Sequence, residues 1–568
     1  MSGGRAVGRS IGAPAALAGG RRLEVAGLFV VLLAVAAALR WPYFFYVELG
    51  WDEILYSLIA QDLLNGAPAY VGQWDRKPIG IFLVLAAFQS VLGDGVLALR
   101  VAAAAGIALS ATGLVVLSRQ WLPTLPMVGL TAALFSIAYT LNRGGAELNT
   151  ELWYAPFVCW AVVCLTAGLR TTGAAAERRI VLAFLLLGLG LQIKYVVVFT
   201  ILTLGVVYLA WALGHGAHRE PRRLARVLVL SGVAAALPTL AVLATYAAIG
   251  HLDAWWHANI VANFGLVSGG EDYRVGFSGL WRYADLFLPF TVLAPVGLVY
   301  LLVDGVRRAD GLPAALALGY LAGGVVSLAF LGRFTQHMAM ELVPVVALLA
   351  AVGLHGAARV AGAVLHLLRV RAEARRALTG GAVALGALLV VAYGVKYEWS
   401  RSVEMLQQRA ERDDPHWGDL TAAAAAHLRA RLEPGDEIYV FGRTLGLYPL
   451  TGRRPPTDFA FPLSLTGGYA PIDGLGELRR ILSTCPGFIV RGDEMGPVRS
   501  DVHGPAVLEL LAATLARSYV VERDFERFRG SSGRPVGEGV GLTIYRLRDG
   551  ACDAALPPRS ARPQRYDR

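Results

Sequence analysis

Two short groups of ionisable residues follow the first long apolar segment of this 568-residue chain. The first group is Trp51-Asp52-Glu53, and the second is Asp75-Arg76-Lys77-Pro78. A carboxylate of the first group could take the proton of an attacking hydroxyl. The basic pair of the second could stabilise a departing phosphate. Ionisable groups at a lipid–water boundary are costly, so we interpret these groups as an active site.

The two central residues also have plainer interpretations. Asp52 begins a probable helix over residues 53–64, where aspartate is a favourable N-cap, and Glu53 would then only favour the helix dipole. Lys77 precedes a proline and could be an interfacial lysine whose ammonium group reaches water. We favour a catalytic role because Asp52 and Lys77 share one loop after an aromatic membrane-interface segment.

Single charged residues also flank or interrupt later apolar segments. Glu147 and Glu151 are four apart and would share a helix face, although solvated loop carboxylates would look the same. Lys194 interrupts a long apolar run, where a charge needs a partner or a function. Arg333 and His337 are also four apart, and the guanidinium of Arg333 suits phosphate oxygens. His337 could equally be a structural residue.

The spacing of ligating residues predicts no metal or cofactor site. His251 and His257 lie outside any tight His, Cys or Asp cluster, so metal dependence stays open. Cys159 and Cys164 lie in one apolar helix at a spacing that separates their faces. Cys485 and Cys552 lie in the C-terminal tail. Whether these two form a disulfide is open, because sequence does not place their Cα atoms.

The composition is typical of a polytopic helical membrane protein. The chain is 55% hydrophobic and 17% charged, and it repeats apolar runs of about 20 residues. Most arginines of the +10 net charge lie in short loops between these runs, as in cytoplasmic loops, so we do not expect a nucleic-acid partner. The run over residues 23–39 is long and bulky aromatic residues follow it, so we expect a retained span rather than a cleaved signal.

The apolar pattern predicts about 11 spans. We expect them over residues 23–40, 96–118, 127–142, 153–169, two within 180–213, 227–249, 285–303, 312–331, 338–354 and 379–395. The apolar segment 80–92 is too short to cross comfortably, so we expect an interfacial or re-entrant helix there. Clusters of arginines then fall on the side of the N-terminus, which predicts a cytoplasmic N-terminus. Arg76-Lys77 is the exception.

Two domains are expected on this topology. Residues 1–395 would form a transmembrane domain with a long first outer loop at 41–95, and residues 396–568 would form an extracytoplasmic domain. The tail alternates helical stretches with short β-rich runs, which predicts a soluble α/β domain. No internal repeat is visible, which weighs against inverted-repeat transporters.

The ordered set of motifs resembles the GT-C glycosyltransferases, in the branch of the dolichyl-phosphate-mannose–protein mannosyltransferases and the lipid A aminoarabinose transferases. The segments that carry the resemblance are Trp51-Asp52-Glu53, Tyr56, Ile59-Ala60, Leu64-Asn65-Gly66, Tyr70, Asp75-Arg76-Lys77-Pro78, Gly93, Arg100, Thr150-Glu151, Leu191-Gln192-Ile193-Lys194, Gly332-Arg333-Phe334, Gln336-His337, Pro344, Ile438-Tyr439-Val440-Phe441-Gly442, Tyr448 and Leu450-Thr451-Gly452-Arg453-Arg454-Pro455. Two positions depart from the pattern: Ile79 replaces a second proline, and Met338 replaces a tyrosine. Both concern the shape of the cavity rather than the class.

The resemblance implies an inverting transfer of a sugar from a polyprenyl phosphate to a hydroxyl, with Asp52 as the base or acceptor-orienting group. Lys77 would contact the donor phosphate or line the cavity wall. The full expectation is a catalytic Asp52 and Glu53, a donor phosphate-binding set of Lys77, Lys194 and Arg333, and an acceptor or cavity set of Tyr56, Arg76, Glu147, Glu151 and His337. No metal is included.

We therefore expect an enzyme at the outer face of a bacterial inner membrane, in contact with membrane lipid. A lipid or glycan transporter (a flippase) is the alternative, but charges gathered at one face favour the enzyme over a translocation path. The acceptor could be a glycolipid such as lipopolysaccharide, a polysaccharide or a protein, since all present a hydroxyl. The sugar and the oligomeric state also stay open.

Overall fold

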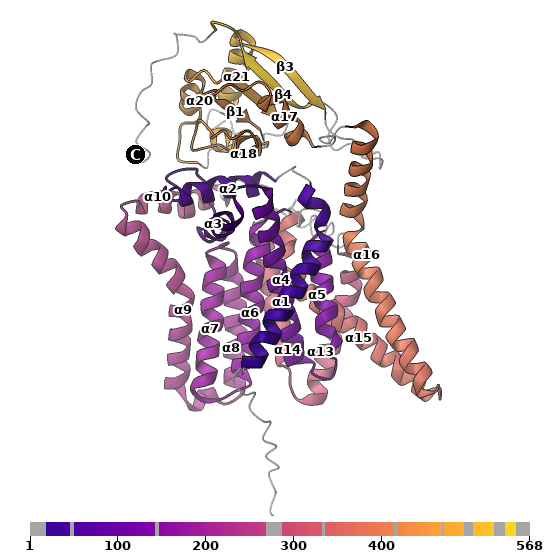
Figure 1. Ribbon diagram of the computed structural model, residues 1–568. Coiled ribbons are helices and arrows are strands. Elements are labelled where there is room, and N and C mark those ends of the chain that lie inside the picture. The colour runs from indigo at the N-terminus through magenta and orange to yellow at the C-terminus, as the bar shows by residue number, and fades with distance from the viewer. Residues whose placement is uncertain are drawn as a thin grey trace, which may run out of the picture.

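A bundle of long helices carries a smaller α/β region at one end (Figure 1). The computed structural model describes residues 19–45, 50–141, 147–267, 287–331, 336–413, 419–442, 444–467, 470–492, 504–526 and 540–551. The chain enters the bundle at α1 and leaves it along α16, which rises beside the bundle to the α/β region.

The long helices of the bundle correspond to the predicted spans. They are α1 (Gly19–Leu39), α4 (Val96–Trp121), α5 (Met127–Tyr139), α6 (Thr150–Leu169), α7 (Gly173–Leu191), α8 (Val197–Gly214), α9 (Pro221–Ala248), α13 (Leu288–Arg308), α14 (Leu312–Leu331), α15 (Val343–Leu367) and α16 (Ala372–Arg412). In the described part of the chain, nine helices are long and apolar enough to cross a bilayer. Helix α5 is short at 13 residues, and α7 carries three charges in its first turns. The predicted polytopic fold is therefore confirmed, with two borderline helices.

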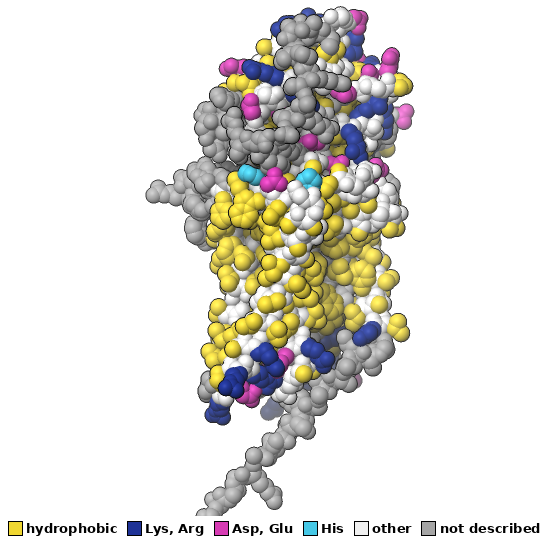
Figure 2. Space-filling view, turned by 90° about the vertical axis from the view of Figure 1, so that its left-hand side faces the viewer, with side chains coloured by type: hydrophobic (Ala, Val, Ile, Leu, Met, Phe, Trp, Pro, Cys, Tyr) yellow, Lys and Arg dark blue, Asp and Glu magenta, His cyan; other side chains and the backbone are white. Residues whose placement is uncertain are grey.

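The surface of the bundle matches a membrane-embedded protein. On the face that Figure 2 draws, hydrophobic side chains cover the middle of the bundle, and basic side chains gather at the end away from the α/β region. The connections α6–α7, α8–α9 and α13–α14 lie at that end (Figure 1). Part of this charge is neutralised locally, as in the Arg170–Asp310 and Arg223–Glu177 ion pairs.

Short helices cover the other end of the bundle. They are η1 (Trp41–Phe45), α2 (Trp51–Leu64), α3 (Gly80–Leu92), α10 (Leu252–Trp256), η3 (His257–Val261), α11 (Ala262–Val267) and η4 (Gln336–Glu341), while η2 (Ala217–Arg219) belongs to the α8–α9 connection. Figure 1 shows α2 lying across the top of the bundle and α3 seen end-on there. Helix α3 therefore lies where an interfacial helix was expected.

The α/β region is built on a four-stranded mixed sheet. Its strands are β1 (Ile438–Phe441), β2 (Phe488–Gly492), β3 (Tyr519–Glu526) and β4 (Val540–Leu547), in the order β1-β2-β4-β3. Strand β1 is parallel to β2, and β4 is antiparallel to both of its neighbours. The predicted β-rich runs are β1, β2 and β4; the charged edge strand β3 was not predicted, because its polar residues obscure the alternation.

Helices cover both faces of this sheet. They are α17 (Leu420–Arg429), α18 (Leu447–Thr451), α19 (Leu463–Thr466), α20 (Gly474–Ser483) and α21 (Gly504–Ser518). Alternate residues of β1 point to opposite faces. Ile438 therefore packs in the cluster with α17 and α18, whereas Tyr439 packs in the cluster with α20 and α21.

The α/β region is packed onto α2, in the connection between α1 and α4. Ile54 and Leu58 of α2 belong to the same hydrophobic cluster as β1, β2 and α17. Helix α16 runs unbroken through the expected domain boundary at residue 395. The two-domain division thus stays a prediction about folding units, because α2 contributes to both cores.

Candidate active site

Helix α2 presents two adjacent carboxylates to different surroundings. Asp52 is partly exposed, whereas Glu53 is buried. Successive residues of a helix are rotated by about 100°, so the two side chains cannot share one environment. Their environments decide which role each carboxylate can take.

Glu53 is fully occupied by structural contacts. It forms an ion pair with Arg100 of α4 at 3.0 Å, and both side chains are almost completely buried. Its carboxylate also accepts the backbone N–H groups of Gly50 at 3.0 Å and Leu148 at 2.8 Å. The geometry therefore favours a positioning role for Glu53 rather than the predicted catalytic role.

Asp52 faces Lys77, as predicted from their shared loop. The Nζ atom of Lys77 lies 3.6 Å from Oδ1 of Asp52 and 3.7 Å from Oδ2 of Asp75. The same ammonium group sits 5.3 Å from the ring centroid of Tyr56, one turn along α2 from Asp52. This ammonium group is therefore largely shielded from solvent, between carboxylate oxygens and an aromatic face.

Lys194 is paired with Glu151, and this pair lies next to the first one. The ammonium of Lys194 contacts Oε1 of Glu151, which is 1% exposed as a side chain. A backbone contact brings the two lysines into one region: the N–H of Gly80, three residues after Lys77, donates to the carbonyl of Gln192 at 2.8 Å. The sequence predicts that Lys194 needs a partner or a function, and the structure shows that its partner is Glu151.

His337 joins the cluster from η4. It is close enough to Glu151, Lys194, Asp52 and Lys77 for all four charges to affect its pKa. Arg333, the third predicted phosphate ligand, lies outside the described residues. The site thus assembles residues from α2, from the loop before α3, from α6, from the α7–α8 connection and from η4.

Contacts with Tyr70 and with the helices after α9 hold the Asp75-Arg76-Lys77 segment in place. The guanidinium of Arg76 donates to Oδ1 of Asn263 at 3.0 Å, and Asn263 returns a bond to the Arg76 carbonyl. The hydroxyl of Tyr70, which is buried, donates to the carbonyl of Lys77 at 2.9 Å. The amide oxygen of Asn259 accepts from the hydroxyl of Tyr195 at 2.7 Å. Arg76 is therefore held by α11.

Glu147 packs against the start of α2. A Cβ atom on Gly50 would lie 2.2 Å from its Oε2 atom. Only glycine at position 50 allows this approach without displacement. Glu147 is thus a neighbour of the helix that carries Asp52.

The surroundings of the titratable groups shift their pKa values in different directions. Burial would raise the pKa of Asp52, but Lys77, with His337, Arg76 and Lys194, outweighs burial and holds that pKa below its ordinary value. Burial instead raises the pKa of Asp75 despite Lys77. Burial also lowers the pKa of His337 against the pull of Glu151. At neutral pH, Asp52 is therefore ionised and His337 uncharged.

Several residues of the site were missed by the sequence reasoning. Asp75 was noted in its motif but given no role, and Asn259 and Asn263 were not considered. Outside the site, Glu341 was also not considered, although a lone carboxylate near the start of the predicted span 338–354 is a signal that could have been used. The two asparagines left no such signal, because amides are common in loops.

Within the residues that the structure describes, no group of three or more His, Cys, Asp and Glu side chains could hold a metal ion. Cys485 is disulfide-bonded, whereas Cys159 and Cys164 are free. Cys552 lies outside the described residues.

Comparisons with known proteins support the predicted fold. No protein-family model matches the sequence. Over 271 residues the chain is 29% identical to undecaprenyl phosphate-alpha-4-amino-4-deoxy-L-arabinose arabinosyl transferase 1 of Pseudomonas fluorescens. That match covers 44% of this chain and 45% of the relative, so the chain matches less than half of the relative's length.

Two solved structures share the fold over nearly the whole chain. ArnT from Cupriavidus metallidurans bound to undecaprenyl phosphate is 17% identical with a TM-score of 0.56, over 94% of this chain and 99% of that chain. Its apo state is 15% identical with a TM-score of 0.54, over 92% and 98%. At these identities the likeness establishes the fold alone, and the predicted polytopic helical bundle with a C-terminal α/β region is confirmed.

Proposed function

We propose that this protein transfers a sugar from a polyprenyl-phosphate donor to a hydroxyl acceptor, with inversion, at the end of the bundle that faces the α/β region. The observation that carries the proposal is the position of Lys77 between Asp52 and Asp75. This arrangement supports the proposal, because a cation able to bind the donor phosphate lies beside an ionised carboxylate able to accept the proton. The undecaprenyl phosphate bound to ArnT supports the choice of donor class.

In the proposed reaction each bond change and proton transfer can be assigned to one of these residues. The acceptor oxygen attacks the anomeric carbon from the face opposite the phosphate, and its proton passes to a carboxylate oxygen of Asp52. The bond between the anomeric carbon and the phosphate oxygen breaks, and its electron pair stays on the phosphate. The leaving group becomes a phosphate monoester with one more negative charge, which Lys77 and Lys194 are placed to stabilise. Arg333 is proposed to assist them.

The hydrophobic surface of the bundle suits such a donor. A polyprenyl chain is apolar, and the hydrophobic surface in Figure 2 ends where the short helices α2 and α3 begin in Figure 1. The lipid chain can remain among the helices while its phosphate reaches the charged cluster. Basic side chains at the opposite end favour a cytoplasmic location for that end. The site would then face outward from a bacterial inner membrane, and the disulfide at Cys485 is compatible with that compartment.

Replacement of Asp52 tests the proposal directly. Asp52→Asn should lower the release of polyprenyl phosphate by at least about a hundredfold, since a positioned base contributes roughly 10²–10⁴-fold. The measurement is mass spectrometry of lipid products from purified protein in nanodiscs with undecaprenyl-phosphate sugars and candidate acceptors. Asp94→Asn, at an exposed carboxylate after α3, is the matched control. Full activity of folded Asp52→Asn would overturn the role of Asp52. Donor translocation without cleavage would favour a transporter.

A further inference from the structure

Glu341 is a buried carboxyl group that the proposed reaction does not use. It is the last residue of η4 and is 4% exposed. Its Oε2 atom accepts the hydroxyl of Ser327 at 3.1 Å and the hydroxyl of Tyr154. Its Oε1 atom is buried and has no hydrogen-bond partner among the described residues. The two carboxyl oxygens therefore have very different surroundings.

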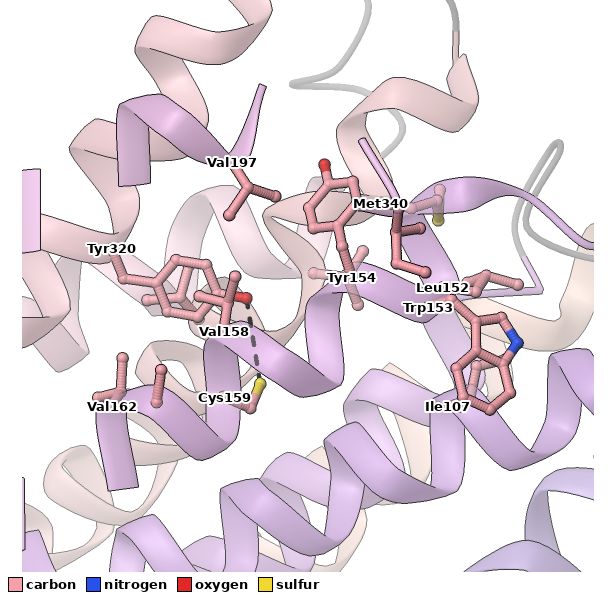
Figure 3. Close-up of a cluster of buried hydrophobic side chains, with 14 of the residues drawn as sticks. Ile107, Leu152, Trp153, Tyr154, Val158, Cys159, Val162, Val197, Tyr320 and Met340 are labelled. Atoms are coloured by element: carbon pink, nitrogen blue, oxygen red, sulfur yellow. Dashed lines mark hydrogen bonds between the residues drawn. The ribbon is translucent and has the colours of Figure 1, made fainter. Parts of the chain in front are cut away.

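The groups around Glu341 come from three other elements. Helix α6 supplies Tyr154 and Glu151, α14 supplies Tyr320 and Ser327, and the α7–α8 connection supplies Lys194; His337 lies on η4 itself. Figure 3 shows Tyr154 and Tyr320 in this region, with the Tyr320 hydroxyl turned to Cys159 and the Tyr154 ring extending away from it. Among the described residues, Lys194 is the cation that acts on Glu341.

Lys194 already has a partner. Its ammonium group contacts Glu151, and an ionised Glu341 would place a second carboxylate next to that pair. A buried carboxylate with one oxygen left unpaired is costly, so burial favours the neutral acid. Burial raises the pKa of Glu341 to about 8, although Tyr154, Lys194 and Ser327 oppose this rise. The carboxyl group is therefore mostly protonated at neutral pH.

We propose that Glu341 is a positioning residue that, as an uncharged acid, leaves Lys194 on Glu151, and that its ionisation draws Lys194 away and slows transfer. The inference rests on the proposed function, because Lys194 is assigned there to the donor phosphate. An uncharged Glu341 keeps the hydrogen bonds of Tyr154 and Ser327 without adding negative charge where the phosphate must bind.

The test is the pH dependence of transfer in wild type and Glu341→Gln. Wild type should lose roughly tenfold in kcat/KM for each pH unit above 8, since only the neutral acid is competent and a single ionisation has that slope. Glutamine stays neutral and can still accept from Tyr154 and Ser327, so Glu341→Gln should remain active and lose this alkaline fall. Glu220→Gln, at an exposed carboxylate at the opposite end of the bundle, should keep the wild-type profile. An alkaline fall of unchanged steepness in Glu341→Gln would overturn the inference.

A second measurement does not depend on activity. Infrared spectroscopy of the full-length protein should show the carbonyl band of a protonated carboxylic acid that disappears with a midpoint near pH 8 and is absent in Glu341→Gln. If wild type shows no transfer at all, this titration still tests Glu341, while the proposed function fails separately. Absence of such a band at pH 7 would contradict the protonated state.

Discussion

At the scale of single residues, neighbouring carboxylates on one helix have separate tasks. Asp52 meets the ammonium group of Lys77, whereas Glu53 is enclosed by Arg100 and two backbone N–H groups. The first arrangement leaves a carboxylate that a substrate can reach, and the second satisfies a buried carboxylate completely. Breaking the Glu53–Arg100 pair should therefore lower thermal stability, whereas replacing Asp52 should lower activity and leave thermal stability nearly unchanged.

Arg100→Met should destabilise the fold rather than act on chemistry alone. The substitution leaves the Glu53 carboxylate buried without its cation, and breaking a buried pair costs about 3–5 kcal/mol. Thermal unfolding in detergent should show a clearly lower midpoint for Arg100→Met, while Asp52→Asn should unfold close to wild type. The double variant Glu53→Met/Arg100→Met should regain part of the loss, because it removes the stranded charge. An unchanged midpoint for Arg100→Met would contradict the structural role of this pair.

At the scale of elements, the contact between α3 and the end of α7 brings the two lysines together. Gly80 is the first residue of α3, and its N–H group meets the carbonyl of Gln192. A Cβ atom at position 80 would lie 2.5 Å from that carbonyl oxygen, which is closer than real Cβ contacts allow. Lys77 and Lys194 therefore depend on a glycine for their relative position.

Gly80→Ala should separate Lys77 from Lys194, the two residues proposed to bind the donor phosphate. Because the clash is with backbone, α3 must shift, and a misplacement of about 1 Å can cost roughly 10²-fold in rate. We expect a loss of transfer with weaker donor binding, measured by product formation over a range of donor concentrations. Gly95→Ala is the control, since a Cβ atom there meets nothing within 4 Å and the backbone conformation suits alanine. Equal activity of both variants would argue against the role of this contact.

At the scale of the whole molecule, the α/β region is fastened to the loop that carries Lys77. The backbone N–H of Trp74 donates to the Asp458 carbonyl at 2.8 Å, and the Trp74 ring packs against Phe459 at 5.9 Å between centroids. Arg454 also forms an ion pair with Asp62 of α2 at 3.2 Å. The tail thus helps to hold the loop that carries Lys77 in place.

Phe459→Ala should loosen that loop while the tail remains folded. Phe459 is buried, and loss of a buried phenylalanine costs about 3–5 kcal/mol. Hydrogen–deuterium exchange should rise over residues 70–77, and the rate of transfer should fall. Leu515→Ala removes an equally buried side chain from a different cluster, on the face of the sheet that α20 and α21 cover. That control should destabilise the tail without raising exchange over 70–77; the same rise in both variants would show a general effect of tail stability.

The sequence by itself determined the class of protein and most of its elements. Span lengths, apolar runs and arginine-rich loops are local properties, so the spanning helices, three of the four strands and the place of α3 could be predicted. The order of motifs also pointed to the correct fold. The proximity of Asp52 to Lys77 followed from their shared loop.

Only the tertiary structure decided which polar groups meet. Glu53 turned inward because packing fixes the rotation of α2, and a helix places adjacent side chains on different faces. Lys194 forms an ion pair with Glu151, and Glu341 lies near this pair. These residues come from elements far apart in the chain, so only the packing of those elements brings them together. Burial then set the charge of each carboxyl group, and burial is a property of the packed molecule, because a charge is stable only where neighbours or water can solvate it.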